Sequence, residues 1–192
     1  MRALVSVIVP TRNSEKTMEM CLGSIRRQTY PNVEIVIVDA YSCDGTRKIA
    51  EKYDPRIVTS RAYRSEARNI GVRESRGDFL LFVDSDMELG PSVVQGCVEK
   101  SEKHYDALVI PEVSSGTGFW AQCKALEKSC YLGDDTIEAA RFFKRSVFQG
   151  IGGYDPELEA GEDWDLNQRI MKAGRRIGRT NTFIKHNEGL KS

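Results

Sequence analysis

Short apolar runs rich in β-branched residues alternate with segments of helical periodicity through residues 4–112. Nearly continuous apolar strands separated by helices are typical of a parallel sheet that is covered on both faces. The sequence therefore predicts an α/β fold, with a doubly wound, mostly parallel sheet and helices on both faces, as a single domain over residues 1–192. The predicted strands are LVSVIVP (4–10), VEIVIVD (33–39), RIVTS (56–60), DFLLFVD (78–84) and DALVIPE (106–112).

Helices are expected between these strands. Met18, Cys21, Leu22 and Ile25 recur at the spacing of one helix face. Further helices are predicted over DGTRKIAEKY (44–53), 65–75, 91–104 with Pro91 in the first turn, 119–132, and from about Glu162, with a loop at 114–118. We expect residues 113–192 to complete the cleft formed by residues 1–112 rather than to fold alone.

The charge balance and the cysteines limit the classes of partner. Lys plus Arg equals Asp plus Glu, 28 of each, so no general attraction to nucleic acid is expected. The five dispersed cysteines form no CxxC pair, which indicates reduced thiols in a cytoplasmic protein rather than a disulfide framework or a zinc site. No apolar run reaches the roughly 18 residues that a membrane-spanning helix needs.

Polar side chains gather where the predicted strands end. Pro10, Thr11, Arg12 and Asn13 follow the first strand, Asp39 ends the second, and Asp84 and Asp86 end the fourth. In an open α/β sheet the ligand binds outside the carboxyl ends of the strands. We therefore expect the site at this edge, although strand ends are often polar simply because they are solvated.

The Asp84-Ser85-Asp86 segment carries two like charges two positions apart. In an extended conformation these side chains point to the same side, and two carboxylates on one side suit Mg²⁺ or Mn²⁺. The alternative is a pair of solvated loop aspartates. Neither GxxxxGK[ST] nor GxGxxG occurs, so an ordinary P-loop or dinucleotide site has no support.

Two charged segments follow in the second half. Six acids and no base occupy positions 155–165, and six bases and no acid occupy 166–187. A helix N-terminus accounts for one or two of the acids, and a carboxylate beside others is a candidate general base. The basic stretch is either a solvated helix face or a contact for an anionic partner such as a phosphate or lipid headgroup.

Four blocks in order carry a family resemblance. They are VSVIVPTRN, QTYPNVEIVIVDAYSCDGT, EARNIGVRESRGDFLLFVDSDMEL and FFKRSVFQGIGGYDPEL with GEDWDLNQRI. Together they resemble the family 2 glycosyltransferases with the GT-A fold, over roughly residues 4–188. The resemblance implies a nucleotide-sugar donor, a divalent cation (Mn²⁺ or Mg²⁺) and inversion at the anomeric carbon.

The resemblance also implies roles for individual residues. Pro10, Thr11 and Asn13 would line the nucleotide pocket, where Arg12 could stack on a base or pair with a phosphate. Asp39 would bind the base, and Arg68 would face the nucleotide or its phosphates. Trp164 is a further candidate for substrate binding. Asp86 would be the direct metal ligand, with Asp84 nearer the ribose and His186 in the position of a further ligand. Asp163 would be the general base, with Glu162 beside it.

Departures from the family pattern leave substrate choice open. The chain has Ala40 after Asp39, where the family often has Asp, and Arg12 where it often has Tyr or Phe, so UDP- and GDP-sugars both remain candidates. The acceptor is a saccharide or a polyprenyl-phosphate or other lipid-linked molecule. In the lipid case residues 166–187 would touch the cytoplasmic face of a membrane. One alternative function is a non-catalytic sugar-nucleotide-binding module. A nucleotidyltransferase is less favoured, because PTRNSEK lacks the Gly-rich loop expected after the first strand of such an enzyme.

Overall fold

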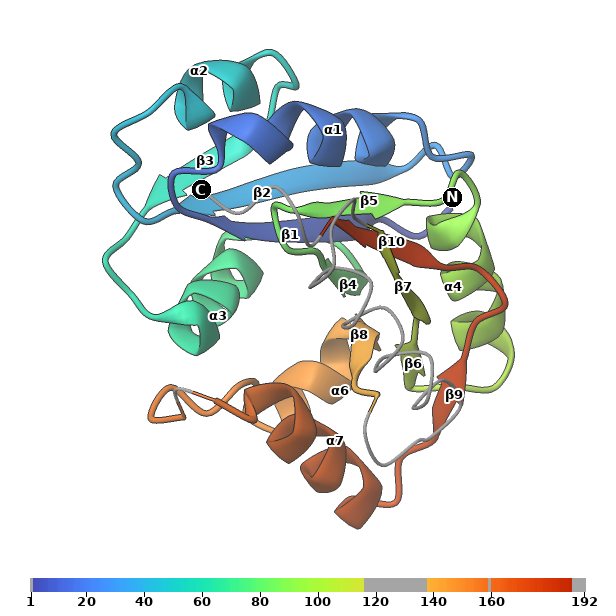
Figure 1. Ribbon diagram of the computed structural model, residues 1–192. Coiled ribbons are helices and arrows are strands. Elements are labelled where there is room, and N and C mark those ends of the chain that lie inside the picture. Colours follow the sequence, from blue (N-terminus) through green and yellow to red (C-terminus); the bar gives the residue numbers. More distant parts are fainter. Residues whose placement is uncertain (1, 116–137, 159, 188–192) are drawn as a thin grey trace.

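The computed structural model describes residues 2–115, 138–158 and 160–187. Its main sheet has seven strands in the order β3-β2-β1-β4-β8-β6-β9, and a second sheet has three in the order β5-β10-β7 (Figure 1). The main-sheet strands are β1 (Val5–Thr11), β2 (Val33–Asp39), β3 (Arg56–Thr59), β4 (Phe79–Phe82), β6 (Ala107–Val109), β8 (Ala140–Lys144) and β9 (Ile177–Arg179). The second sheet contains β5 (Met87–Leu89), β7 (Glu112–Ser115) and β10 (Ile184–Asn187).

Strand directions confirm the mostly parallel sheet. Only β8 runs antiparallel to its neighbours β4 and β6, and the other adjacent strands of the main sheet pair in parallel. In the second sheet, β10 is antiparallel to β5 and parallel to β7. Because β8 lies between two strands of the first half, residues 138–187 complete the same sheet rather than form another one.

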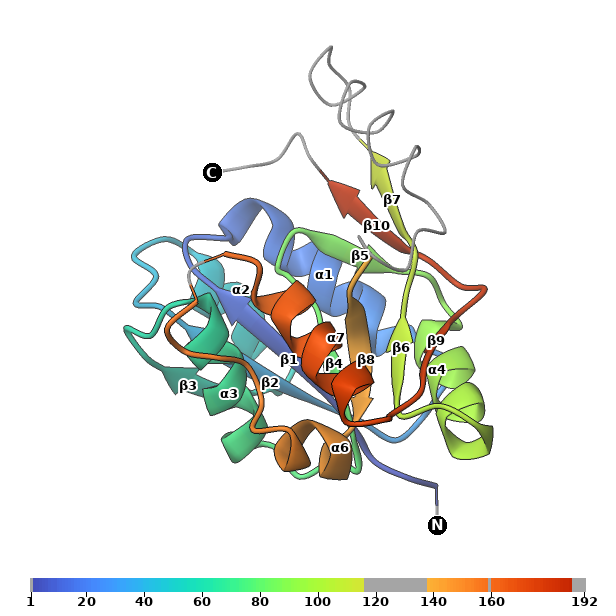
Figure 2. The same ribbon diagram turned by 90° about the horizontal axis from the view of Figure 1, so that it is seen from below.

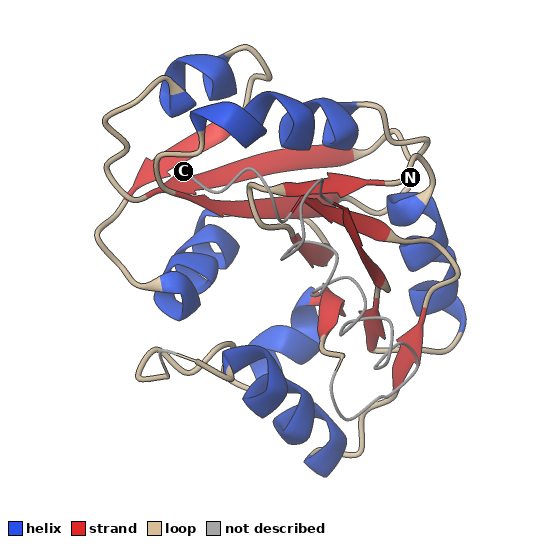
Figure 3. Cartoon of the chain, viewed as in Figure 1, coloured by secondary structure: helices blue, strands red, loops and turns tan. Residues whose placement is uncertain are grey.

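Helices cover both faces of the main sheet, as predicted (Figures 1 and 3). Side chains alternate along a strand, so Val7 and Val9 join the core cluster under α1, α2 and α4, while Ile8 joins the cluster under α3, α6 and α7. The helices are α1 (Glu15–Arg26), α2 (Thr46–Glu51), α3 (Arg64–Glu74), α4 (Val93–Lys103), α6 (Arg145–Gly150) and α7 (Glu162–Lys172). Viewed from below, α7 crosses the sheet while β7 and β10 extend away from it (Figure 2).

The first four predicted strands are confirmed within two residues as β1 to β4, and Met18, Cys21, Leu22 and Ile25 are all buried in α1. The run 106–112 was predicted as one strand, which is wrong. It divides around Pro111 into β6 and β7, because proline cannot donate to the ladder and the chain there passes to the second sheet. Ser114 and Ser115 therefore belong to a strand and not to the predicted loop.

Other differences lie at helix boundaries and in the second half. Pro91 precedes the N-cap residue Ser92 of α4 instead of lying in its first turn. The predicted helix 119–132 and residues Cys123 and Cys130 lie outside the described residues. The three cysteines within the described ranges, Cys21, Cys43 and Cys97, are free thiols. None of the described helices is long and apolar enough to cross a bilayer.

Two glycines determine the positions of α3 and α7, the helices that carry Arg68, Glu162 and Asp163. Gly71 of α3 packs so closely on β1 that an added Cβ would lie 2.3 Å from Cγ2 of Ile8, so a larger residue would push the helix and its Arg68 away from the sheet. Gly161 has a φ of 76° at the N-cap of α7, a conformation that glycine adopts without strain. It turns the chain so that Glu162 and Asp163 begin the helix.

Candidate active site

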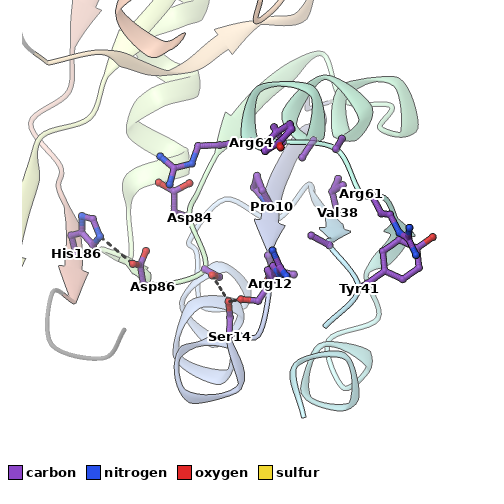
Figure 4. Close-up of a pocket in the computed structure, with 16 residues that line it drawn as sticks. Pro10, Arg12, Ser14, Val38, Tyr41, Arg61, Arg64, Asp84, Asp86 and His186 are labelled. Carbon is purple, nitrogen blue, oxygen red and sulfur yellow. Dashed lines mark hydrogen bonds and ion pairs between the residues drawn. The ribbon is translucent and has the colours of Figure 1, made fainter. Parts of the chain in front are cut away.

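A cavity of about 780 Å³ opens at the carboxyl ends of β1, β2 and β4. Figure 4 shows its two ends. Asp84, Asp86 and His186 lie at one end, and Tyr41 and Arg61 at the other. The predicted residues Pro10, Thr11 and Arg12 line the space between them. The cavity thus lies at the edge of the sheet where the sequence predicts the site.

The loop after β2 is fastened to the end of β1. The side-chain oxygen of Asn13 accepts a hydrogen bond from the backbone amide of Cys43 at 2.9 Å, and the backbone amide of Asn13 donates to Oγ of Ser42 at 2.9 Å. Ser42 in turn donates to Asp39 at 2.5 Å. Asp39 is 4% exposed, so it lies beneath the cavity and supports the loop, instead of lining the cavity surface.

Tyr41 projects from this loop at one end of the cavity. Its φ is 54°, a left-handed conformation that costs a bulky residue free energy and often marks a functional site. The side chain is 57% exposed, and the guanidinium of Arg61 lies 5.1 Å from the ring centroid. The pair offers a flat, positively charged surface, which sequence reasoning did not single out.

The Asp84-Ser85-Asp86 segment is a turn rather than an extended strand. The Met87 amide donates to the Asp84 carbonyl at 3.0 Å, and Oγ of Ser85 lies 2.8 Å from that of Ser14. The extended conformation on which the sequence prediction rested is therefore wrong, although both side chains line the same cavity. Asp84 faces two guanidinium groups, whereas Asp86 faces His186, with 3.3 Å between Oδ2 and Nε2.

Arg68 of α3 is the centre of a buried charge cluster. Its Nη1 donates to Glu162 at 3.1 Å and to Asp163 at 3.0 Å, and its Nη2 donates to Asp84 at 3.3 Å. The residue is only 1% exposed, so it contacts carboxylates instead of facing the cavity as the resemblance implied. A buried guanidinium needs such partners, and three carboxylates from α7 and from the turn after β4 supply them.

Glu112 and Arg141 extend this cluster and were missed by sequence reasoning. Arg141 of β8 donates through Nε to Glu112 at 2.6 Å and through Nη1 to Asp84 at 3.5 Å. The second oxygen of Glu112 lies 3.6 Å from Nδ1 of His186. Both residues stand alone in short segments, where no sequence spacing relates them to the other carboxylates.

The buried charges shift two pKa values. Burial by itself raises the pKa of Asp84, but the positive charges of Arg141 and Arg68 outweigh it and hold that pKa below its ordinary value. Burial raises the pKa of the Tyr154 phenol well above its usual range, and the negative charge of Asp163, to which it hydrogen-bonds, adds to this. The Asp163 carboxylate is thus held by Arg68 and Tyr154 together.

Two further predicted features, Trp164 and the basic stretch 166–187, lie on α7 and on the segment that follows it. Trp164 is 55% exposed and is not among the side chains that line the cavity. In the basic stretch, Arg169 is paired with Asp165 at 2.6 Å and Arg179 with Glu138, whereas the other bases are exposed. Those exposed bases are Lys172, Arg175, Arg176 and Lys185.

The residues present are suited to a hard divalent cation at the Asp86 end. Within the described ranges, no group of three His, Cys, Asp or Glu side chains is arranged as a complete metal site. Asp86 and His186 nevertheless offer a carboxylate and an imidazole side by side. Mg²⁺ and Mn²⁺ sites commonly take one or two protein ligands and fill the rest with water and phosphate oxygens.

Known proteins resemble this chain in sequence and in fold. Residues 6–154 match the model of glycosyl transferase family 2. The Bacillus subtilis (strain 168) protein named glycosyltransferase EpsJ is 34% identical over 125 residues, covering 62% of this chain and 35% of EpsJ. This chain thus spans about a third of the length of that relative.

Two solved structures share the fold. TarS from S. aureus (residues 1–349, in complex with UDP-GlcNAc) matches with a TM-score of 0.74 and 22% identity, covering 96% of this chain and 58% of that one. The mannosyltransferase PcManGT from Pyrobaculum calidifontis, in complex with GDP-Man and Mn²⁺, matches with a TM-score of 0.74 and 23% identity, covering 100% and 58%. The chain has the GT-A fold and belongs to glycosyl transferase family 2, a family of transferase enzymes.

Proposed function

We propose that this domain transfers a sugar from a nucleoside diphosphate sugar to an acceptor hydroxyl, or to a lipid phosphate, with inversion at the anomeric carbon. The observation that carries the proposal is the cavity with two unlike ends. An aromatic and guanidinium surface at Tyr41 and Arg61 suits a base, and the Asp86 and His186 end suits a metal-bound diphosphate. The related folds hold UDP-GlcNAc and GDP-Man, which are donors of this class.

Asp86 and His186 would hold the cation. Bound there, Mn²⁺ or Mg²⁺ supplies positive charge that stabilises the departing nucleoside diphosphate. Asp84 lies beside this end, and its oxygens already accept hydrogen bonds from Arg68 and Arg141. We therefore propose that Asp84 binds the ribose of the donor and that Asp86 is the metal ligand. Arg12, which lines the cavity, is placed to meet the base or a phosphate.

Asp163 is the proposed general base. Its carboxylate takes the proton from the acceptor hydroxyl while the hydroxyl oxygen bonds to the anomeric carbon and the bond from that carbon to the diphosphate oxygen breaks. The side chain is 28% exposed, so an acceptor can reach it. Arg68 and Tyr154 orient it, and Glu162 shares the same Arg68 nitrogen.

A thermal-shift screen of UDP-, GDP- and dTDP-sugars tests this proposal, each with Mn²⁺, Mg²⁺ or EDTA. A ligand that binds only the native state raises the melting temperature, by an amount that corresponds to about 2.7 kcal/mol at 100 times its Kd. We expect a metal-dependent shift with one base, followed by donor turnover with an acceptor. Binding without turnover would instead support the non-catalytic module, and no shift with any donor would overturn the proposal.

A lipid-linked acceptor would bring the domain to a membrane surface. The exposed bases Lys172, Arg175, Arg176 and Lys185 support this part of the proposal, since each basic residue near an anionic surface contributes about 1 kcal/mol. Co-sedimentation with vesicles of mixed neutral and anionic lipid would show salt-sensitive binding. Equal recovery with neutral vesicles would contradict a contact made through these bases, and recovery with neither kind of vesicle would contradict a membrane contact.

A further inference from the structure

We propose that Glu112 is a positioning residue that fixes the proton of His186 on Nδ1, so that the lone pair of Nε2 faces Asp86 and the cavity. The inference rests on the proposed function, because the consequence of this tautomer is a nitrogen ligand for the cation at Asp86. Glu112 does not itself line the cavity among the described residues. Its role would therefore be exercised through the imidazole, and not through contact with substrate.

The second sheet brings the three side chains together. Glu112 lies on β7 and His186 on the parallel neighbour β10, where Ile184 is the register partner of Glu112. Nδ1 of His186 lies 3.6 Å from Oε2 of Glu112, and Nε2 lies 3.3 Å from Oδ2 of Asp86. The imidazole thus lies between two carboxylates, one inside the second sheet and one at the cavity wall.

A neutral imidazole carries one N–H, and a carboxylate can only accept. The two carboxylates therefore compete for one proton. A cation at Asp86 needs the lone pair of Nε2, which leaves the proton on Nδ1 toward Glu112. Histidines that bind metals usually donate their other N–H to such a partner, and removing the partner typically weakens metal binding by about 10- to 100-fold.

Arg141 makes the orientation of Glu112 specific. Its Nε donates to Oε1 at 2.6 Å, so the oxygen that faces His186 is the other one. All three side chains are largely buried: Arg141 is 13% exposed, Glu112 22% and His186 17%. A guanidinium cannot accept a hydrogen bond, so any side chain at position 112 must present an acceptor toward Arg141.

This asymmetry makes Glu112→Gln a sharp test. Glutamine has one oxygen and one NH₂ group, and Arg141 requires the oxygen. The NH₂ group then faces Nδ1 and donates a hydrogen bond to it, so the imidazole proton moves to Nε2. A protonated Nε2 has no lone pair with which to bind a cation. The variant is nearly isosteric with the wild type and keeps the contact with Arg141, so it is expected to fold.

The first readout is the tautomer of His186, observed by two-bond ¹H–¹⁵N correlations in protein labelled at histidine. The chain has two histidines, and His104→Gln assigns the signals. We expect Nδ1–H in the wild type with Mg²⁺, at a pH where the imidazole is neutral, and Nε2–H in Glu112→Gln. An Nε2–H wild type would overturn the inference without needing any variant.

The second readout is Mn²⁺ affinity, from the loss of the free-ion signal in electron paramagnetic resonance. Glu112→Gln should weaken binding by about 10- to 100-fold. Glu88→Gln is the matched control, because Glu88 lies on β5 of the same sheet but pairs with Arg27, at 3.7 Å. Equal affinity of Glu112→Gln and wild type would overturn the inference. A wild type that binds neither Mn²⁺ nor nucleotide would refute the proposed function, while the tautomer would still decide the role of Glu112.

Discussion

Replacing Arg68 by methionine tests whether the buried charge cluster holds the two halves of the site together. Arg68 is 1% exposed and pairs with Glu162 and Asp163 of α7 and with Asp84 after β4. Methionine fills much of the same volume but leaves those carboxylates without their common partner. Breaking a buried ion pair in this way costs about 3–5 kcal/mol. In a domain of this size each kcal/mol lowers Tm by about 2–4 °C, so a fall of roughly 6–20 °C is expected.

Urea unfolding at pH 7 gives the stability difference directly, and Arg73→Met is the matched control on the same helix. Arg73 pairs with Glu66 at 2.6 Å but its side chain is 60% exposed, so its loss should cost no more than about 1 kcal/mol. If Arg68→Met also lost less than about 1 kcal/mol with its fold intact, the charges in the cluster would not need Arg68, and the reasoning would be refuted.

The pH dependence of the same variant has a definite sign. The pKa of Asp84 is lowered in the folded state, so its contribution is fully present above its unfolded-state pKa of about 3.9 and is lost as the pH falls through the lower folded-state value. In Arg68→Met the carboxylates lose a positive neighbour and protonate more readily on acidification. The difference between wild type and variant should therefore be full at pH 7 and become smaller as the pH falls below about 4. A difference that grew on acidification would contradict this.

Three further predictions concern the proposed chemistry. Asp163→Asn should keep donor affinity while turnover falls by about 10²–10⁴-fold, and near-normal turnover would remove it as the base. Asp86→Ala should abolish the Mn²⁺-dependent part of UDP or GDP affinity in calorimetry, so an unchanged affinity would exclude it as a ligand. Tyr41→Ala should weaken nucleoside diphosphate binding, by the 1–3 kcal/mol or so that base stacking contributes, but leave Mn²⁺-pyrophosphate binding unchanged; equal losses for both probes would show that Tyr41 does not contact the base.

The elements that the sequence predicted are those whose apolar residues follow a pattern that repeats within a few positions along the chain. VEIVIVD corresponds to β2 without any shift of boundary, because a short, nearly continuous apolar run rich in β-branched residues is typical of a strand with both faces buried. The stripe that contains Met18 and Cys21 likewise predicts the buried face of α1. Asp86 and His186 were proposed as partners through the family resemblance, and the structure places them 3.3 Å apart.

The remainder depends on pairings between distant segments. The three-residue strand β5 has no periodicity of its own, and it pairs with β10, about a hundred residues later in the chain. Arg141 and Glu112 are single charges 29 positions apart, and nothing in either neighbourhood predicts their contact. The turn at Asp84–Met87 also overrode the extended geometry from which we expected two parallel carboxylates.

The charge balance of the site explains why its two aspartates differ. One chain of contacts joins five carboxylates (Asp84, Asp86, Glu112, Glu162 and Asp163), three guanidinium groups (Arg64, Arg68 and Arg141) and the imidazole of His186. With a neutral imidazole, carboxylates outnumber guanidinium groups by two among the described residues of this cluster. Asp84 lies next to two of the guanidinium groups, whereas the contact of Asp86 in the cluster is with His186. The excess charge is therefore concentrated at the Asp86 end, where a divalent cation would neutralise it, and a diphosphate that arrived without the cation would meet net repulsion there.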